Sequence, residues 1–281
     1  MKTSLRQIVS AVTRCLMLVV LLSLQATAQE PTARPSPESP SFTFAVVSDL
    51  HVSEHEGPRY LKAFVRQIDA MPSRPDLVLV TGDIHVDPFQ KVFDEIKPAV
   101  PFHVVAGNHE SRDARNKLAK MFPNDFKGKD FYSFTYKNAK FIAMCDAASN
   151  GDHVGHFESQ FIQGERQGQW IEDQLRESRG KFDHVFIFGH IPPSPDGNAD
   201  QSCLSTNDQK QLREWIEQYR PTALFFGHLH KKMDFKIGPS PVYLLPSLNW
   251  NFKPEVQPRG FLLVKVCPKD VTAEFVPLKL E

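Results

Sequence analysis

Apolar runs that end in short polar stretches recur along the chain from residue 42 onward. The runs 42–49, 76–83 and 100–108 have the length and content of buried strands. Between them, residues 59–71 and 89–96 place their apolar side chains at helical spacing. This alternation of strand and helix predicts parallel βαβ units.

The pattern changes in the second half of the chain. Strand-like runs at 131–136 and 139–146 are separated by Lys137 and Asn138, which predicts a hairpin. Amphipathic helices and buried strands then alternate again, over 165–178, 184–190, 207–219 and 222–230. Residues 232–276 contain short strands and no convincing helix. The pattern as a whole predicts an α/β fold with two mixed sheets packed together and helices outside.

The first 28 residues have a composition unlike the rest. Basic residues precede the apolar run 15–22, and Ala26-Thr27-Ala28 follows it. This is typical of a secretory signal peptide cleaved after Ala28. An uncleaved membrane anchor is the alternative, but the run is far shorter than the roughly 20 residues that a spanning helix needs. We therefore expect a secreted or periplasmic protein, with no integral membrane segment in the mature chain.

The next segment, residues 29–41, carries four prolines and no apolar periodicity. We interpret it as a disordered, extended tether. The folded domain is then expected to cover residues 42–281 as a single unit.

Charge and cysteine content narrow the function classes. The chain has 33 basic and 33 acidic residues, and loss of three basic residues with the signal peptide leaves a net charge of 30 − 33 = −3. Nucleic-acid-binding proteins usually have a basic excess, so we expect no nucleic-acid partner. Cys145, Cys203 and Cys267 remain in the mature chain, and the pattern leaves open whether two of them form a disulfide.

The ends of five predicted strands carry the candidate chemistry. The polar residues there are Asp49, His51, Asp83, Asn108, His109, Glu110, His190, His228 and His230. Glycines at 82, 107, 189 and 227 come just before them and allow tight turns and close approach of the backbone. Parallel strands bring their carboxyl ends to one edge, so these side chains are expected to meet. If the last strand continues past Gly227, His228 and His230 point the same way.

Carboxylates, an amide and several imidazoles at one apolar-walled edge need a cation. Without one, the like charges repel and the polar groups stay unsatisfied. A pair of metal ions removes this conflict. Mixed oxygen and nitrogen ligands suit Mn, Fe, Zn or Ni and suit calcium poorly.

The motifs D-x-H, G-D, G-N-H-E, G-H and G-H-x-H, in this order, resemble those of the calcineurin-like metallophosphoesterase superfamily. The resemblance covers residues 42–250 and is to the small single-domain, secreted bacterial-type members. It implies a four-layer α/β/β/α sandwich, and an activity on phosphate esters of small molecules or proteins that needs two divalent or trivalent metal ions, with Mn, Fe or Zn favoured.

The resemblance also implies roles for individual residues. Asp49, His51 and His230 would bind one metal, and Asn108, His190 and His228 would bind the other. Asp83 would bridge the two.

The implied reaction is attack on phosphorus by a hydroxide that bridges the two metals. His109 would assist the leaving group, and Glu110 would support His109 without binding metal. Arg112 is a candidate substrate-binding residue that could clamp a phosphate, or else a solvated arginine at a helix start. His85 could face the site, although a turn histidine is the simpler interpretation.

Two departures from the superfamily exclude subgroups. Val86 occupies the position of the tyrosine that purple acid phosphatases carry, and no Arg-Gly follows the second aspartate of "GDIHVDP". Phosphomonoesters and phosphodiesters both remain open as substrates. The alternative function is a non-catalytic member of the same fold that binds metal or a phosphoprotein.

Overall fold

A computed structural model describes residues 41–54, 56–147, 151–164, 166–198, 202–249 and 258–280. These residues belong to one compact unit, Ser39–Glu281. The expected signal peptide, and the expected tether apart from residue 41, lie outside the described residues. Within the described part, no helix is both long and apolar enough to cross a bilayer.

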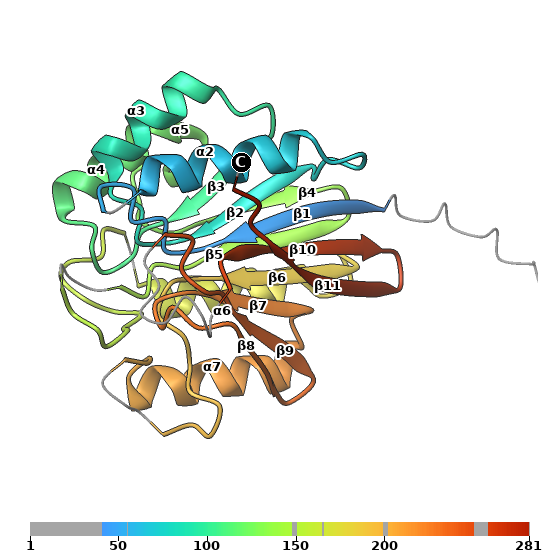
Figure 1. Cartoon of the computed structure of the whole chain (residues 1–281). Coiled ribbons are helices and arrows are strands. Elements are labelled where there is room, and N and C mark those ends of the chain that lie inside the picture. The colour runs from blue at the N-terminus through green and yellow to red at the C-terminus, as the bar shows by residue number, and fades with distance from the viewer. Residues whose placement is uncertain are drawn as a thin grey trace, which may run out of the picture. The chain divides into compact units, whose positions relative to one another are not determined.

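The first sheet is built on three parallel strands (Figure 1). They are β1 (Phe42–Val47), β2 (Leu77–Thr81) and β3 (Phe102–Val105). Two antiparallel strands, β10 (Gly260–Cys267) and β11 (Asp270–Pro277), extend it beyond β1. The helices α2 (Gly57–Asp69) and α3 (Val86–Ile96) connect the parallel strands, and α4 (Arg112–Met121) and α5 (Pro123–Phe126) follow β3.

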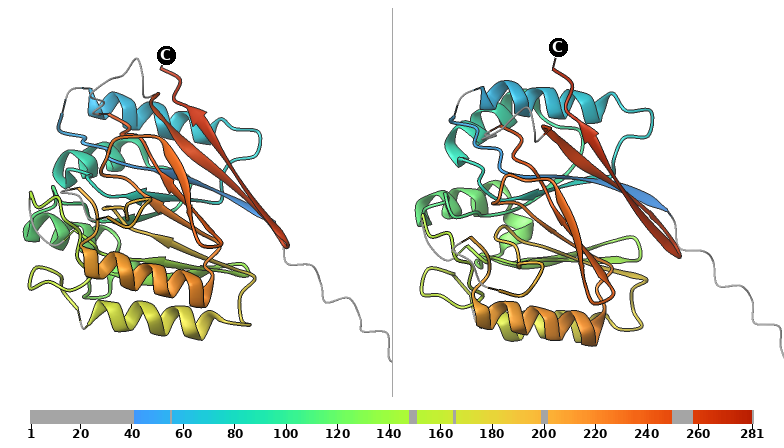
Figure 2. Two further views of the ribbon diagram at one scale, coloured as in Figure 1. Left: turned by 90° about the horizontal axis from the view of Figure 1, so that it is seen from below. Right: turned by 60° about the horizontal axis from the view of Figure 1, so that its bottom comes forward.

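The second sheet has the order β4-β5-β6-β7-β9-β8. Its strands are β4 (Tyr132–Tyr136), β5 (Ala139–Ala143), β6 (His184–Phe188), β7 (Ala223–Phe226), β8 (Met233–Ile237) and β9 (Ser240–Leu244). β5, β6, β7 and β9 run parallel, whereas β4 and β8 pair antiparallel at the edges. The helices α6 (Gln167–Ser178) and α7 (Thr206–Tyr219) lie together on its outer face (Figure 2).

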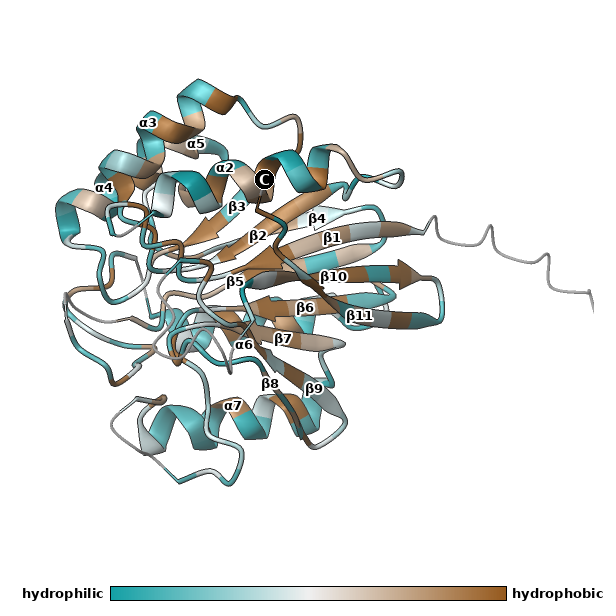
Figure 3. Cartoon of the chain, in the orientation of Figure 1, coloured by the Kyte–Doolittle hydropathy of each residue, from teal (hydrophilic) through white to brown (hydrophobic). Residues whose placement is uncertain are grey.

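Aromatic side chains pack between the two sheets. Phe44 of β1 is fully buried, and its ring meets Phe141 of β5, Phe186 of β6 and Phe225 of β7 at centroid distances of 5.3, 5.2 and 5.7 Å. Each contact is edge-to-face, the arrangement that aromatic quadrupoles favour. Figure 3 shows the apolar strands between helices whose outward turns are hydrophilic. Two mixed sheets flanked by helices confirm the predicted fold class.

Two details of the secondary structure differ from the sequence-based expectation. Apart from the alternative of a helix start at Arg112, helices α4 and α5 were not predicted, because Leu118 is the one strongly apolar residue that α4 buries and α5 has four residues. β7 ends at Phe226, so the strand does not continue through His228 and His230.

Cys145 and Cys203 are buried and Cys267 is half-buried, and none of the three takes part in a disulfide.

Candidate metal centre

Left-handed backbone turns follow the strands that carry the candidate ligands. Asp49 and His51 after β1, Asp83 after β2, and His228 and His230 after β7 all have φ between 39° and 67°. Such φ values are uncommon for residues with a side chain and cluster at functional sites. The expectation that His228 and His230 lie on an extended strand is therefore wrong. Each left-handed residue turns the chain, and the two imidazoles reach different neighbours.

Glycines let carboxylates come close to the neighbouring turn. A Cβ on Gly107 would collide with the Asp83 carboxylate, and one on Gly227 would collide with Asp49 and the Ser48 hydroxyl. Close approach of the backbone was predicted at these glycines, and the groups that approach it are the side chains of Asp83, Asp49 and Ser48.

Each buried aspartate at these strand ends also accepts a hydrogen bond from a backbone amide of another loop. Asp49 accepts from the His228 amide at 3.1 Å, and Asp83 accepts from the His109 amide at 3.1 Å. Asp146, which follows β5, accepts from the His190 amide at 3.0 Å. Burial raises the pKa of Asp146 to about 6, although the His190 side chain and the hydrogen bonds from the Ile191 and His190 amides lower it. The carboxylates therefore position the loops that present the ligands.

Glu110 has a similar structural role. Its Oε1 accepts from the amides of Ile84 and His85, both at 3.0 Å, and its Oε2 accepts from the Gly107 amide at 2.7 Å. The carboxylate thus ties the turn after β2 to the turn after β3. The expected support of His109 by Glu110 stays a prediction, and these hydrogen bonds indicate that it would act through the backbone of the two turns.

One cluster of candidate ligands consists of Asp49, His51, Asp83 and His230, whose donor atoms all lie within 4.8 Å of one another. His51 Nε2 is 3.2 Å from His230 Nε2 and 3.6 Å from Asp83 Oδ2. His230 Nε2 is 3.2 Å from Asp49 Oδ1. All four residues are buried, so these ligand atoms face one another and not bulk water.

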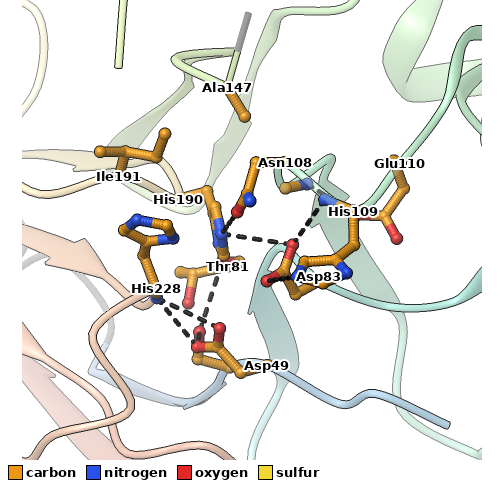
Figure 4. Close-up of polar contacts among 12 residues, drawn as sticks. Asp49, Thr81, Asp83, Asn108, His109, Glu110, Ala147, His190, Ile191 and His228 are labelled. Atoms are coloured by element: carbon orange, nitrogen blue, oxygen red, sulfur yellow. Dashed lines mark hydrogen bonds and ion pairs between the residues drawn. The ribbon is translucent and has the colours of Figure 1, made fainter. Parts of the chain in front are cut away.

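A second cluster consists of Asp83, His190 and His228 (Figure 4). His190 Nε2 lies 3.3 Å from Asp83 Oδ1 and 3.0 Å from Asn108 Oδ1. His190 Nδ1 donates to the carbonyl oxygen of Thr81 at 2.7 Å, which leaves Nε2 to face the two oxygens. Asp83 belongs to both clusters, with one carboxylate oxygen toward each.

The pKa values of the site depend on burial and on the attraction between its charged groups. Burial opposes charge on both Asp83 and His190, but their mutual attraction outweighs it: the pKa of Asp83 falls and that of His190 rises to about 10. Burial lowers the pKa of His51 to about 4 and that of His228 to about 3, so both imidazoles are neutral at pH 7.

The donor set fits metal ions. His190 Nε2 meets two oxygens that only accept hydrogen bonds, so either a proton or a cation has to lie between them. Among the residues that the structure describes, the buried amide nitrogen of Asn108 has no hydrogen-bond partner, whereas its side-chain oxygen faces His190 Nε2. Neutral imidazoles and carboxylates are the ligands of Zn, Mn and Fe.

His109 stands at the edge of this arrangement. Its side chain is 35% exposed, and Nε2 lies 3.9 Å from Asp83 Oδ2. Its ring centroid is 5.1 Å from that of His51. The imidazole therefore adjoins the centre and remains open to solvent, where a substrate could reach it.

Arg112 has a different environment from the one expected of a phosphate clamp. It begins α4, and its two terminal nitrogens donate to Asp130 Oδ1 at 2.9 Å and Oδ2 at 2.6 Å. Asp130 is nearly buried, so this bidentate pair holds the guanidinium in place. The structure favours the helix-start alternative, with an ion-pair partner in place of solvent.

Sequence reasoning missed several residues that position the ligands. Ser247 Oγ donates to the carbonyl oxygen of Asp49 at 2.8 Å, and Asn249 Nδ2 donates to that of His51 at 2.7 Å. Glu54 lies near His51 and His85. Ser247 and Asn249 are nearly 200 residues from their partners, and no local pattern could have identified them.

Comparisons with known proteins identify the family of this chain. A family model described as calcineurin-like phosphoesterase matches residues 42–232. A probable cyclic nucleotide phosphodiesterase of Fibrobacter succinogenes is 20% identical over 190 residues, which are 64% of this chain and 68% of that protein. The serine/threonine-protein phosphatase CPPED1 of Mus musculus is 24% identical over 198 residues, which are 62% of this chain and 59% of that protein.

Two further proteins are similar to this chain, one in sequence and one in fold. A probable glycerophosphodiester phosphodiesterase GpdQ of Arcobacter nitrofigilis is 25% identical over 204 residues, covering 66% of this chain and 70% of that protein. A dimetal phosphatase from Danio rerio has the same fold, with a TM-score of 0.62 at 18% identity, and covers 85% of this chain and 99% of that one. The family model matches more than half of the residues of this chain, so the chain belongs to the calcineurin-like phosphoesterase family.

Proposed function

We propose that this chain hydrolyses phosphate esters by means of two metal ions. The observation that carries the proposal is the position of Asp83 between two sets of nitrogen donors: His51 Nε2 is 3.6 Å from one carboxylate oxygen and His190 Nε2 is 3.3 Å from the other. A single carboxylate between two such sets is the arrangement that a bridged metal pair needs.

The residues divide into two groups around Asp83. Asp49, His51 and His230 would hold one ion, and Asn108, His190 and His228 would hold the other. Mn, Fe or Zn suits these ligands best. When bound, the pair supplies a water nucleophile at neutral pH and compensates negative charge on the phosphoryl oxygens.

His109 would provide the proton for the leaving group. It lies beside Asp83 and is open to solvent, and its backbone amide is fixed by Asp83 Oδ1 at 3.1 Å. A general acid must reach the leaving oxygen through a hydrogen bond, and an imidazole at the rim of the centre can do so.

The substrate class is a phosphomonoester or a phosphodiester. The relatives named above include a phosphatase and phosphodiesterases, so similarity supports both. The chain's calculated charge after cleavage, and the absence of a basic excess, favour small-molecule or protein phosphate esters over nucleic acids.

The test is turnover of p-nitrophenyl phosphate and bis-p-nitrophenyl phosphate by purified protein, loaded in turn with Mn²⁺, Fe²⁺ or Zn²⁺. We expect metal-dependent release of p-nitrophenol from at least one ester. A folded protein that binds two metal ions and turns over neither ester, nor any natural ester in a wider panel, would support the non-catalytic alternative.

We also propose that residues 42–281 form one domain that is exported after cleavage near Ala28. The basic, apolar and small-residue pattern of residues 1–28 supports this. Amino-terminal sequencing of protein expressed from the full chain would detect cleavage, and a retained Met1 would contradict it.

A further inference from the structure

A second group of metal-binding side chains adjoins the candidate centre on its solvent side. One donor atom from each of His51, Glu54, His85 and His109 lies within 4.8 Å of the other three. His51 and His109 were identified from motifs, whereas Glu54 and His85 have no role in the proposed hydrolysis. Their convergence therefore needs its own explanation.

The carboxylate of Glu54 lies between two imidazoles. Its Oε1 is 3.7 Å from His85 Nε2 and 3.8 Å from His51 Nδ1. These separations are slightly wider than the roughly 3.4 Å between two ligand atoms that both lie about 2.1 Å from a tetrahedral zinc ion. A small movement of the Glu54 side chain would bring its oxygen and the His85 nitrogen to one ion.

His85 is fixed in this orientation from two sides. The Ser53 hydroxyl forms a hydrogen bond with Nδ1, which leaves Nε2 to face Glu54. The His85 amide donates to Glu110 at 3.0 Å, and the backbone is left-handed with φ of 61°. A non-glycine residue held in this conformation costs energy that the surrounding structure has to compensate.

The group is accessible, unlike the two clusters around Asp83. The side chains of Glu54, His85 and His109 are 30%, 14% and 35% exposed, whereas Asp83 is 2% exposed. An ion could therefore enter and leave from solvent without a change in the buried centre.

We propose that Glu54, His85 and His109 form a third metal site, of zinc type, that inhibits the enzyme when it fills. Two imidazoles and one carboxylate are a known zinc donor set that leaves a position for water. His51 stays with the buried pair through Nε2 and forms the wall between the two sites. Resting on the hydrolysis proposed above, the inhibition follows because a His109 nitrogen that binds metal has no lone pair with which to carry a proton.

The third site is the weakest of the three. Its ligands are partly exposed, and an ion there is repelled by the two ions of the buried pair. The negative charges of Asp83 and Asp49 offset part of this repulsion. Low metal concentrations would fill the pair and support turnover, and higher concentrations would fill the third site and stop it.

The decisive experiment counts bound ions without any substrate. Equilibrium dialysis of metal-free protein against Zn²⁺, followed by metal analysis, should give three ions per wild-type chain. Glu54→Gln and His85→Asn should each bind one ion fewer. Asparagine tolerates the left-handed backbone at residue 85, so this substitution removes the imidazole with little effect on the turn.

A matched control is His156→Asn. His156 Nδ1 lies 3.4 Å from Asp208 Oδ2, so it is another exposed imidazole beside a carboxylate, outside the three clusters. This variant should still bind three ions. A third ion that survives in Glu54→Gln and His85→Asn, or a wild-type chain that binds no more ions than these two variants, would overturn the proposal.

The count also separates this inference from the proposed function. The difference of one ion between wild type and His85→Asn reports the third site alone, and the remaining ions report the pair. If the wild type bound one ion and His85→Asn bound none, the third site would stand and the metal pair would fail.

A kinetic experiment tests the inhibition. Zn²⁺ is titrated into Mn²⁺-supported turnover of a phosphate ester, and each variant is compared with its own uninhibited rate. We expect the inhibiting Zn²⁺ concentration to rise about tenfold to 100-fold in Glu54→Gln and His85→Asn, the scale of affinity loss seen when even a supporting group is removed. The same inhibiting concentration in wild type and both variants would show that the third ion does not act through this site.

Discussion

Asp83 and His190 come from different sheets, and Asp83 Oδ1 lies 3.3 Å from His190 Nε2 while Nδ1 of the same imidazole donates to Thr81 at 2.7 Å. Asp83 follows β2 and His190 follows β6. The pair therefore joins the two sheets at the point where the candidate ligands meet. The two groups form an ion pair, because their mutual attraction lowers the pKa of Asp83 and raises that of His190 to about 10.

Metal uptake should release at least one proton at pH 7. His190 is protonated there because its pKa of about 10 lies above the solution pH, and a metal ligand has to be neutral imidazole. Affinity should thus weaken as the pH falls from 9 to 6, by roughly tenfold per unit for one proton. Calorimetric titration in two buffers of different ionisation enthalpy counts the protons, and an identical binding heat in both would contradict the prediction.

Asp83→Asn should lose both metal ions of the pair, whereas Asp49→Asn should lose one. Asp83 belongs to both clusters of candidate ligands and Asp49 to one of them. Asparagine tolerates the left-handed φ of about 50° at each position. Each variant therefore differs from the wild type in the charge of one ligand and not in backbone strain. Metal analysis after loading with Mn²⁺ gives the counts. Equal losses in the two variants would remove Asp83 from its bridging position.

His109→Ala should keep the metal pair and lose about 10²- to 10⁴-fold in turnover, the range that general acid catalysis contributes. Its backbone amide still donates to Asp83, so the ligand turn stays in place. The loss should be largest for alkyl phosphates and smaller for p-nitrophenyl phosphate, because nitrophenolate leaves without a proton. Rates on the two substrates provide the measurement, and equal losses on both would argue against proton transfer by His109.

Glu110→Ala should destabilise the protein by roughly 3 kcal/mol, because two buried amides and one half-buried amide lose their acceptor at about 1–3 kcal/mol for each buried group. Glu110→Gln keeps one acceptor oxygen and should cost less. Chemical denaturation of both metal-free variants measures the difference. Full stability with lost turnover would instead support a role of Glu110 on the His109 side chain.

Arg112→Ala should lower stability and leave KM unchanged. The guanidinium pairs with Asp130, and removal of one partner leaves a nearly buried carboxylate with less compensation; because Arg112 is 38% exposed, we expect a loss of about 1 kcal/mol. Thermal unfolding and steady-state kinetics together test this. A raised KM at unchanged stability would restore Arg112 as a phosphate clamp.

Sequence alone determined the local elements and the chemistry at their ends. Apolar periodicity distinguishes strand from helix because it records which side of each element faces the core, as for the buried face of α2, with Tyr60, Leu61, Phe64, Val65 and Ile68. The order of the motifs also indicated which residue types gather at the strand ends. These are properties of short stretches, and a chain carries them wherever the stretches lie in space.

Tertiary structure decided which of those residues meet and what each one contacts. Phe44 of β1 packs against three strands of the other sheet, and across the two packed sheets the turns after β2 and β6 place His190 beside Asp83. The partners of Arg112 and Glu110 depend on contacts between loops, as does the position of Glu54 beside His85. Such contacts depend on the relative placement of whole elements, and no repeat or spacing within one element records it.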